Sequence, residues 1–110
     1  MIVTIPYVKQ GYMSGGAGYV LSRRALDNFV KKALPNGALC KKEDTGAEDV
    51  EIGKCLENVH VVAGDSRDSE GREKFMPFDP LAHLTMKKPK KPDWWYWTNI
   101  FYPSKEVSLN

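Results

Sequence analysis

A run of small residues near the amino terminus constrains the fold of this chain most strongly. Gly15, Gly16 and Gly18 enclose Ala17 in this segment. Glycine has no Cβ, so its backbone can adopt positive φ or let another group approach closely. The spacing matches neither a dinucleotide-binding fingerprint nor a phosphate loop that ends in Gly-Lys-Ser/Thr. Two interpretations stay open, namely a tight turn packed under a neighbouring element and the floor of a binding site.

The length and composition are typical of one small globular domain. The chain has 110 residues, of which 42% are hydrophobic and 27% charged. A net charge of +2 does not favour nucleic acid as a partner. No apolar stretch approaches the roughly 20 residues that cross a bilayer. We therefore expect any membrane anchor or targeting segment only in a full-length form of the protein.

Local patterns predict two helices. Ser22 is a suitable N-cap for a helix over residues 23–34, which ends at the turn-forming residues 35–37. Its apolar face consists of Leu26, Phe29, Val30 and Ala33, at helical spacing. A second helix is expected over residues 47–57. Thr45 and Glu48 match a capping box there, and Gly53 within the helix indicates close packing against a neighbour.

The remaining segments carry weaker patterns. Residues 6–11 have no strong pattern, whereas residues 19–21 and 59–63 have the composition of short strands. Residues 64–71 are expected to form a polar turn. The two prolines of residues 76–80 argue against a helix or a central strand. The lysine and proline run of residues 87–92 is interpreted as an exposed linker, and residues 104–110 as a frayed tail.

Adjacent carboxylates at the start of the second predicted helix are the first candidates for chemistry. Glu48 and Asp49 there would favourably meet the positive end of the helix dipole. This structural interpretation explains Glu48 well. Asp49 has a second interpretation, in which it faces a cleft beside the glycines and acts as a general base on an attacking hydroxyl.

Aromatic residues, histidines and cysteines supply the other candidates. Residues 94–97 read Trp-Trp-Tyr-Trp and would fill a core or form a stacking wall for a sugar ring. His60 and His83 lack a metal-binding motif, so a structural role is favoured for both. Cys40 and Cys55 lack metal-ligand spacing. A disulfide and two free buried thiols remain equally open for them.

Taken together, these motifs resemble one enzyme family. Residues 7–22, 48–55, 63–68, 75–84 and 95–97, with Phe101 and Tyr102, are similar to core 1 β1,3-galactosyltransferases, also called glycoprotein-N-acetylgalactosamine 3-β-galactosyltransferases. The resemblance covers about residues 6–103. The wider family, which includes the Fringe transferases, shares the small-residue segment and the acidic pair.

The resemblance implies an α/β fold of the type A glycosyltransferase class. The chain would be an incomplete catalytic domain over residues 1–110, on the C-terminal, acceptor side of that fold. The implied reaction is the inverting transfer of galactose from UDP-galactose to the 3-hydroxyl of GalNAc on Ser/Thr of a glycoprotein, in mucin-type core 1 O-glycan synthesis. The implied cofactor is Mn²⁺. The implied location is the lumenal side of the Golgi membrane, and a homodimer is an open alternative.

The resemblance also assigns roles to individual residues. Asp49 matches the expected base, and Glu48 is its neighbour. The aromatic residues Trp95 and Tyr96 match a segment expected to contact the acceptor sugar, and the floor near donor and acceptor would consist of Gly15, Gly16 and Ala17. Cys40 and Cys55 match a pair that is disulfide-bonded in an oxidising lumen.

The departures from the family pattern shape what we expect of the chain itself. The Asp-x-Asp metal motif and the Phe-His-Tyr-Val segment of the family are absent from the sequence, so no metal ligand is assigned. We therefore expect a truncated chain with little or no activity by itself. One alternative is a non-catalytic, acceptor-binding or chaperone-like paralogue. Another is an unstable remnant whose open sheet edge aggregates.

Overall fold

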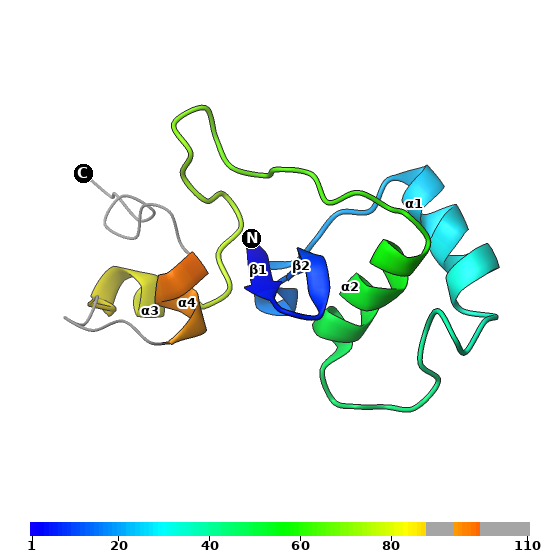
Figure 1. The fold of residues 1–110 in the computed structure, drawn as a ribbon. Helices are drawn as coiled ribbons and strands as arrows, with labels where there is room; N and C mark the ends of the chain where they lie inside the picture. Colours follow the sequence, from blue (N-terminus) through cyan, green and yellow to red (C-terminus); the bar gives the residue numbers. More distant parts are fainter. Residues whose placement is uncertain (88–93, 100–110) are drawn as a thin grey trace.

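The centre of the molecule is an antiparallel hairpin of two strands (Figure 1). The computed structural model describes residues 1–87 and 94–99. Strand β1 (Ile2–Ile5) pairs with strand β2 (Val8–Met13), with Val3 opposite Tyr12 and an irregularity between Val3 and Ile5. The β-branched residues of β1 favour an extended backbone. Residues 6–11, in which no pattern was found, form the turn and most of β2.

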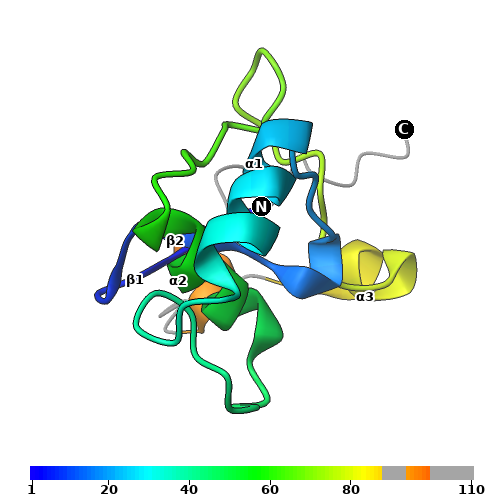
Figure 2. The ribbon, with the colours of Figure 1, turned by 90° about the vertical axis from the view of Figure 1, so that its right-hand side faces the viewer.

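Helices flank the hairpin on two sides. They are the 3₁₀-helix η1 (Gly15–Ala17), helix α1 (Arg23–Asn28), its continuation as the π-helix η2 (Phe29–Ala33), and helices α2 (Glu48–Asn58), α3 (Pro80–Thr85) and α4 (Trp95–Asn99). Helix α2 packs against β2 and α4 packs against β1. Helices α1 and α2 therefore lie on one side of the hairpin and α3 and α4 on the other (Figure 1; Figure 2). The molecule is elongated, with extents of 47 × 27 × 22 Å.

Two separate hydrophobic clusters stabilise these two sides. The cluster beside β1 is built on Met1, Tyr96 and Trp97, with Ala17, Phe78, Met86 and Trp95 packed around it. The cluster beside α2 is built on Ala33, Cys40, Cys55 and Val59, with Phe29, Leu39 and Val61 around it. The buried apolar side chains thus form two clusters, and the hairpin and η1 connect the two sides of the molecule.

The helix over residues 23–34 is confirmed, with a correction to its apolar face. The Ser22 hydroxyl accepts the N–H of Ala25 at 3.0 Å, as predicted for an N-cap. Ala33 is fully buried and Phe29 partly buried. Leu26 and Val30, however, are each 49% exposed. The cluster beside α2 covers only the strip of this helix that contains Phe29 and Ala33.

The second helix is confirmed as well, but its predicted capping box is wrong. Helix α2 begins at Glu48 after Ala47, and no side chain caps that position. A carboxylate oxygen of Asp44 instead accepts the N–H of Gly46 at 2.8 Å, within the preceding loop. The prediction of close packing at Gly53 is confirmed, since a Cβ there would lie 2.6 Å from Cβ of Tyr12.

Both strands predicted outside the hairpin are wrong. Residues 19–21 are not a strand, and Val20 among them is 82% exposed. Residues 59–63 instead contain the C-terminal cap of α2, in which His60 adopts a φ of 63°. The Gln10 side chain then bonds both the carbonyl of Val61 and the N–H of Ala63. One side chain of β2 thus replaces the backbone pairing that a third strand would need.

The C-terminal third agrees with the sequence in part. Residues 64–71 were predicted to form a polar turn, but only residues 69–70 form a turn and residues 64–68 are irregular; residues 76–79 are neither helix nor strand. Helix α3 was missed; it begins at Pro80 with the carboxylate of Asp79 accepting the N–H of Ala82. Residues 88–92 of the predicted linker, Phe101 and Tyr102, and the predicted tail lie outside the described residues. Within residues 1–87 and 94–99, no helix is long and apolar enough to cross a membrane. The assignment to the type A glycosyltransferase fold stays a prediction.

Candidate functional site

The acidic pair and the small-residue segment lie together, although 34 residues separate Gly15 from Asp49. One carboxylate oxygen of Asp49, Oδ2, accepts the N–H of Gly15 at 3.0 Å. The other, Oδ1, accepts the N–H of Val50 at 2.8 Å. A Cβ at Gly15 would lie 2.6 Å from Oε1 of Glu48. Both carboxylates at the start of α2 are therefore next to η1, where the resemblance places a floor.

The rest of the small-residue segment contacts the other side of the molecule. A Cβ at Gly16 would lie 2.5 Å from the carbonyl oxygen of Pro77. Ala17 packs against the hydrophobic cluster that includes Tyr96 and Trp97. The helix η1 thus lies between the acidic pair on one side and the aromatic residues on the other. Both interpretations of the glycines fit this arrangement, because the segment is tightly packed and also borders the candidate residues.

The aromatic segment is divided between core and surface. Tyr96 is fully buried and Trp97 is 8% exposed, so these two rings fill the cluster beside β1. Trp95 is partly buried, and Trp94 is 43% exposed. The ring of Phe78 stacks on Trp94 with centroids 5.3 Å apart and an interplanar angle of 14°. Trp94, to which the family resemblance assigned no role of its own, is therefore the most exposed ring of this segment.

Both histidines have structural positions, as favoured from the sequence. His60 is exposed and forms the helix cap described above. His83 on α3 is 7% exposed. Its Nε2 atom accepts the N–H of Phe78 at 3.1 Å, and its Nδ1 atom lies 3.2 Å from the hydroxyl of Tyr96.

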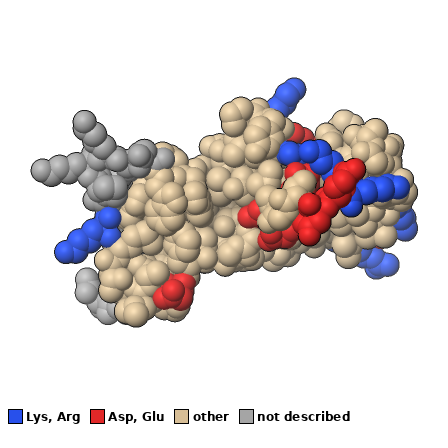
Figure 3. Space-filling model, turned by 90° about the horizontal axis from the view of Figure 1, so that it is seen from below, with Lys and Arg blue, Asp and Glu red and all other residues tan. Residues whose placement is uncertain are grey.

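Tyr12, which the sequence did not single out, has a pKa that is affected by the charge of the candidate base Asp49. Burial raises the pKa of Tyr12, and the negative charge of Asp49 raises it further. Tyr12 belongs to β2 and covers Gly53 of α2. Exposed acidic side chains, including Glu43, Asp44 and Glu48, extend the negative charge around the start of α2. The face seen from below shows acidic side chains grouped together, with lysine and arginine around them (Figure 3).

The described residues do not provide a site for Mn²⁺. No group of three or more His, Cys, Asp or Glu side chains comes together within residues 1–87 and 94–99. Asp49 directs both carboxylate oxygens at backbone N–H groups. The donor set that a metal of this kind requires, several oxygen or imidazole ligands at one point, is not met by this part of the chain.

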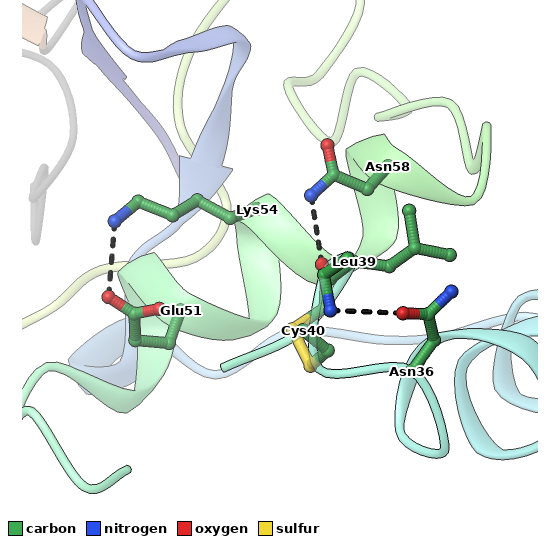
Figure 4. The surroundings of a disulfide bond; sticks show 8 residues. Asn36, Leu39, Cys40, Glu51, Lys54 and Asn58 are labelled. Carbon is green, nitrogen blue, oxygen red and sulfur yellow. Dashed lines mark hydrogen bonds and ion pairs between the residues drawn. A yellow bond between two sulfur atoms is a disulfide. The ribbon is translucent and has the colours of Figure 1, made fainter. Parts of the chain in front are cut away.

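The disulfide implied by the resemblance is confirmed. Cys40 and Cys55 are joined, with their Cα atoms 4.8 Å apart. The alternative of two free buried thiols is therefore wrong. Near this bond the Asn58 side chain donates to the carbonyl of Leu39 at 2.8 Å, and the Asn36 side-chain oxygen accepts the N–H of Ala38 at 2.9 Å (Figure 4). The loop after η2 is thus attached to the helix that carries Asp49.

A separate cavity of about 230 Å³ lies between β2, α2 and residues 61–64. Its lining includes Tyr12, Leu21, Ile52 and Leu56. The lining residues include neither Asp49 nor the aromatic segment. This cavity is therefore distinct from the candidate site around η1.

Comparison with curated proteins supports the resemblance. A protein from Xenopus laevis, named glycoprotein-N-acetylgalactosamine 3-beta-galactosyltransferase 1, is 55% identical over 101 residues. This chain is a relative of the core 1 β1,3-galactosyltransferases. By this resemblance it is classed with the glycosyltransferases. The match covers 92% of this chain but 27% of the Xenopus protein, so the chain spans about a quarter of that relative. No family model matches the chain.

Proposed function

We propose that this chain forms the acceptor side of an inverting galactosyltransferase. The donor would be UDP-galactose, and the acceptor the 3-hydroxyl of GalNAc-α-Ser/Thr on a glycoprotein. The observation that carries the proposal is the hydrogen bond between Gly15 and Asp49, which unites two motifs that the resemblance assigns to one site. The 55% identity to a named galactosyltransferase supports the same function.

In the proposed reaction, Asp49 is the general base. The acceptor oxygen attacks the anomeric carbon of galactose on the face opposite UDP. A bond forms between them while the bond from that carbon to UDP breaks, and its electrons leave with the diphosphate. Asp49 takes the proton of the hydroxyl. Two backbone N–H groups already orient the carboxylate, and each of its oxygens keeps a further lone pair for this proton.

The surroundings of Asp49 suit a sugar acceptor. Because Gly15 and Gly16 have no side chains, the carboxylate of Glu48 and the carbonyl of Pro77 come close to the backbone beside Asp49. The partly exposed rings of Trp94 and Trp95 provide apolar faces of the kind that stack on sugars. Tyr96, fully buried in the structure, supports these rings from within. The disulfide fits the oxidising lumen of the Golgi, which is the proposed location.

A segment exchange tests the proposal. The 101 matched residues of the Xenopus galactosyltransferase are replaced by those of this chain, and transfer to a GalNAc-α-Thr peptide is measured with UDP-galactose and Mn²⁺. We expect the chimera to form the β1,3-linked product. Asp49→Asn should then lower the rate by roughly 10²–10⁴-fold, the range for loss of a general base. Asp44→Asn is the matched control, because Asp44 lies in the exposed loop before α2 and should leave the rate unchanged.

The chimera also separates the proposed function from its competitor. The absence of a metal-ligand cluster in the part of the chain that the structure describes favours a non-catalytic, acceptor-binding protein as the second candidate. That candidate predicts that the chain binds a GalNAc peptide while the chimera transfers no galactose. A chimera with Asp49→Asn that is as active as its parent would instead overturn the role of Asp49.

A further inference from the structure

The buried imidazole of His83 connects three segments that meet at the candidate site. His83 lies on α3 with its ring 5.5 Å from that of Phe78 and 5.6 Å from that of Tyr96. Its two ring nitrogens face the backbone N–H of Phe78 and the hydroxyl of Tyr96. A buried side chain that uses both polar atoms in this way fixes the positions of both neighbours.

The hydrogen bonds determine which nitrogen carries the proton. A backbone N–H can only donate, so Nε2 of His83 must accept from Phe78 with its lone pair. The ring is then neutral, and its single proton is on Nδ1. From Nδ1 it points at the hydroxyl oxygen of Tyr96, 3.2 Å away. This assignment follows from the hydrogen-bond network, as tautomers in proteins ordinarily do.

The two neighbours of His83 support the exposed Trp94 and the partly buried Trp95. Phe78 stacks on Trp94, with ring centroids 5.3 Å apart. Tyr96 meets Trp95 edge to face, with an interplanar angle of 89°. Beyond the tryptophans, Tyr96 belongs to the cluster that Ala17 of η1 contacts. The orientation of both tryptophan rings relative to η1 thus depends on the two groups that His83 holds.

We propose that His83, as the neutral Nδ1–H tautomer, is a positioning residue that sets Trp94 and Trp95 for the acceptor sugar. The proposal rests on the proposed function, because it takes these rings as the acceptor wall. His83 itself does not touch the reacting atoms in this scheme. It acts through Phe78 and Tyr96, one through each ring nitrogen.

The tautomer is tested directly on the folded chain. Side-chain ¹⁵N spectra at neutral pH should show a protonated Nδ1 and an unprotonated Nε2 for His83. Protonation at Nε2 would overturn the proposal. His60, which is exposed, is an internal reference in the same spectrum, and the His60→Gln variant identifies its signals.

Substitutions then test the positioning. His83→Ala removes both bonds, His83→Asn keeps a donor near the Nδ1 position, and Tyr96→Phe removes only the hydroxyl. We expect His83→Ala and Tyr96→Phe to shift the indole N–H resonances of Trp94 and Trp95. In His83→Asn these indole resonances should lie between their positions in the parent and in His83→Ala. Unchanged indole resonances in His83→Ala would contradict the proposal.

Binding of a GalNAc-α-Thr peptide completes the test. We expect Tyr96→Phe to raise its dissociation constant roughly three- to tenfold, the effect of losing the hydrogen bond to His83 from a group that orders a site. The control His60→Gln should bind as the parent does. An unchanged constant in Tyr96→Phe with shifted indoles would refute the link to the acceptor. If the unsubstituted chain binds no peptide, the proposed function fails, and the indole shifts alone decide whether His83 positions the rings.

Discussion

Oδ2 of Asp49 accepts the backbone N–H of Gly15 at 3.0 Å, which joins the start of α2 to η1. The same helix is attached near its other end, where Cys55 is joined to Cys40. Helix α2 is therefore held at both ends, by a charge-assisted hydrogen bond and by a covalent bond. The position of the candidate base depends on these two links and on the packing of α2 against β2.

Alanine at Gly16 should destabilise the fold more than alanine at Gly15. A Cβ at Gly16 would lie 2.5 Å from the carbonyl oxygen of Pro77, and backbone cannot move away easily. At Gly15 the nearest atom is the end of the exposed, flexible Glu48 side chain. We expect Gly16→Ala to lower the free energy of unfolding by about 1–3 kcal/mol, as overpacking does, and Gly15→Ala by less than about 1 kcal/mol. Urea unfolding of both variants measures the difference. Equal losses would argue against the close approach of Pro77.

Gly53 provides a second test of packing, between α2 and β2. Alanine is favoured over glycine by about 1 kcal/mol within a helix. A Cβ at Gly53, however, would lie 2.6 Å from Cβ of Tyr12, which cannot rotate away. We expect a net loss of about 1–2 kcal/mol from Gly53→Ala, because overpacking outweighs the helix preference. In the control Gly64→Ala the new Cβ meets nothing within 4 Å, so stability should stay the same. A stabilised Gly53→Ala would show that the two elements can separate without cost.

The elements that could be predicted from the sequence are those with a local signal at their ends. Ser22 marks the start of α1, and the turn-forming residues 35–37 mark the end of the helix that α1 begins. Asp79 and Pro80 are an equally local N-cap signal for α3. No helix was predicted there, because the two prolines of residues 76–80 were taken as evidence against one. The strand expected over residues 59–63 was wrong for a tertiary reason, since a helix cap and the Gln10 side chain occupy its backbone groups.

The residue pattern offered a place for Asp49 beside the glycines as one of two interpretations, and only the family resemblance favoured it. Nothing local in the sequence relates Gly15 to Asp49, because β2 and α2 must first pack together. The disulfide had the same limitation, since spacing alone left free thiols equally open. The structure then added Tyr12, which owes its raised pKa partly to Asp49. Its involvement has no sequence signal, because it depends on the approach of α2 to β2.

His60 is a site where a substitution should stabilise the protein. Its φ of 63° lies in the left-handed region, which costs a residue with a Cβ about 1–2 kcal/mol. The N–H of Val61 donates to the carbonyl of Leu56 at 2.9 Å, and that of His60 to Glu57 at 3.0 Å, which is the pattern of a glycine-favouring helix cap. We expect His60→Gly to raise the free energy of unfolding by about 1 kcal/mol. His60→Ala keeps the Cβ and should give no gain. A gain with alanine would mean that the imidazole, rather than the backbone, is unfavourable there.

Loss of the disulfide should destabilise the chain substantially. The bond joins residues 15 apart in the sequence, and closing a loop of this size contributes about 3 kcal/mol in the chain-entropy model. Urea unfolding of the oxidised chain is compared with that of the Cys40→Ser, Cys55→Ser double variant. We expect the double variant to unfold at a lower urea concentration than the oxidised parent. Adding a reducing agent should lower the unfolding midpoint of the parent and leave that of the double variant unchanged. A parent insensitive to reduction would contradict the bond.

The ion pair between Asp65 and Arg67 predicts a specific response to acid. Hydrogen bonds from the Arg67 side chain, the shortest at 2.7 Å, lower the pKa of Asp65 to about 2. Because this folded-state pKa is below that of the unfolded chain, about 3.9, the ionised group favours the native state above that value. Its contribution is lost as the pH falls from about 4 through about 2. Carboxyl ¹³C titration should show Asp65 protonating near pH 2 in the parent and closer to its ordinary value in Arg67→Gln. Arg72→Gln is the matched control, since Arg72 pairs with Asp68, and it should leave Asp65 unchanged. An Asp65 that titrates alike in all three proteins would show that the ion pair does not persist in solution.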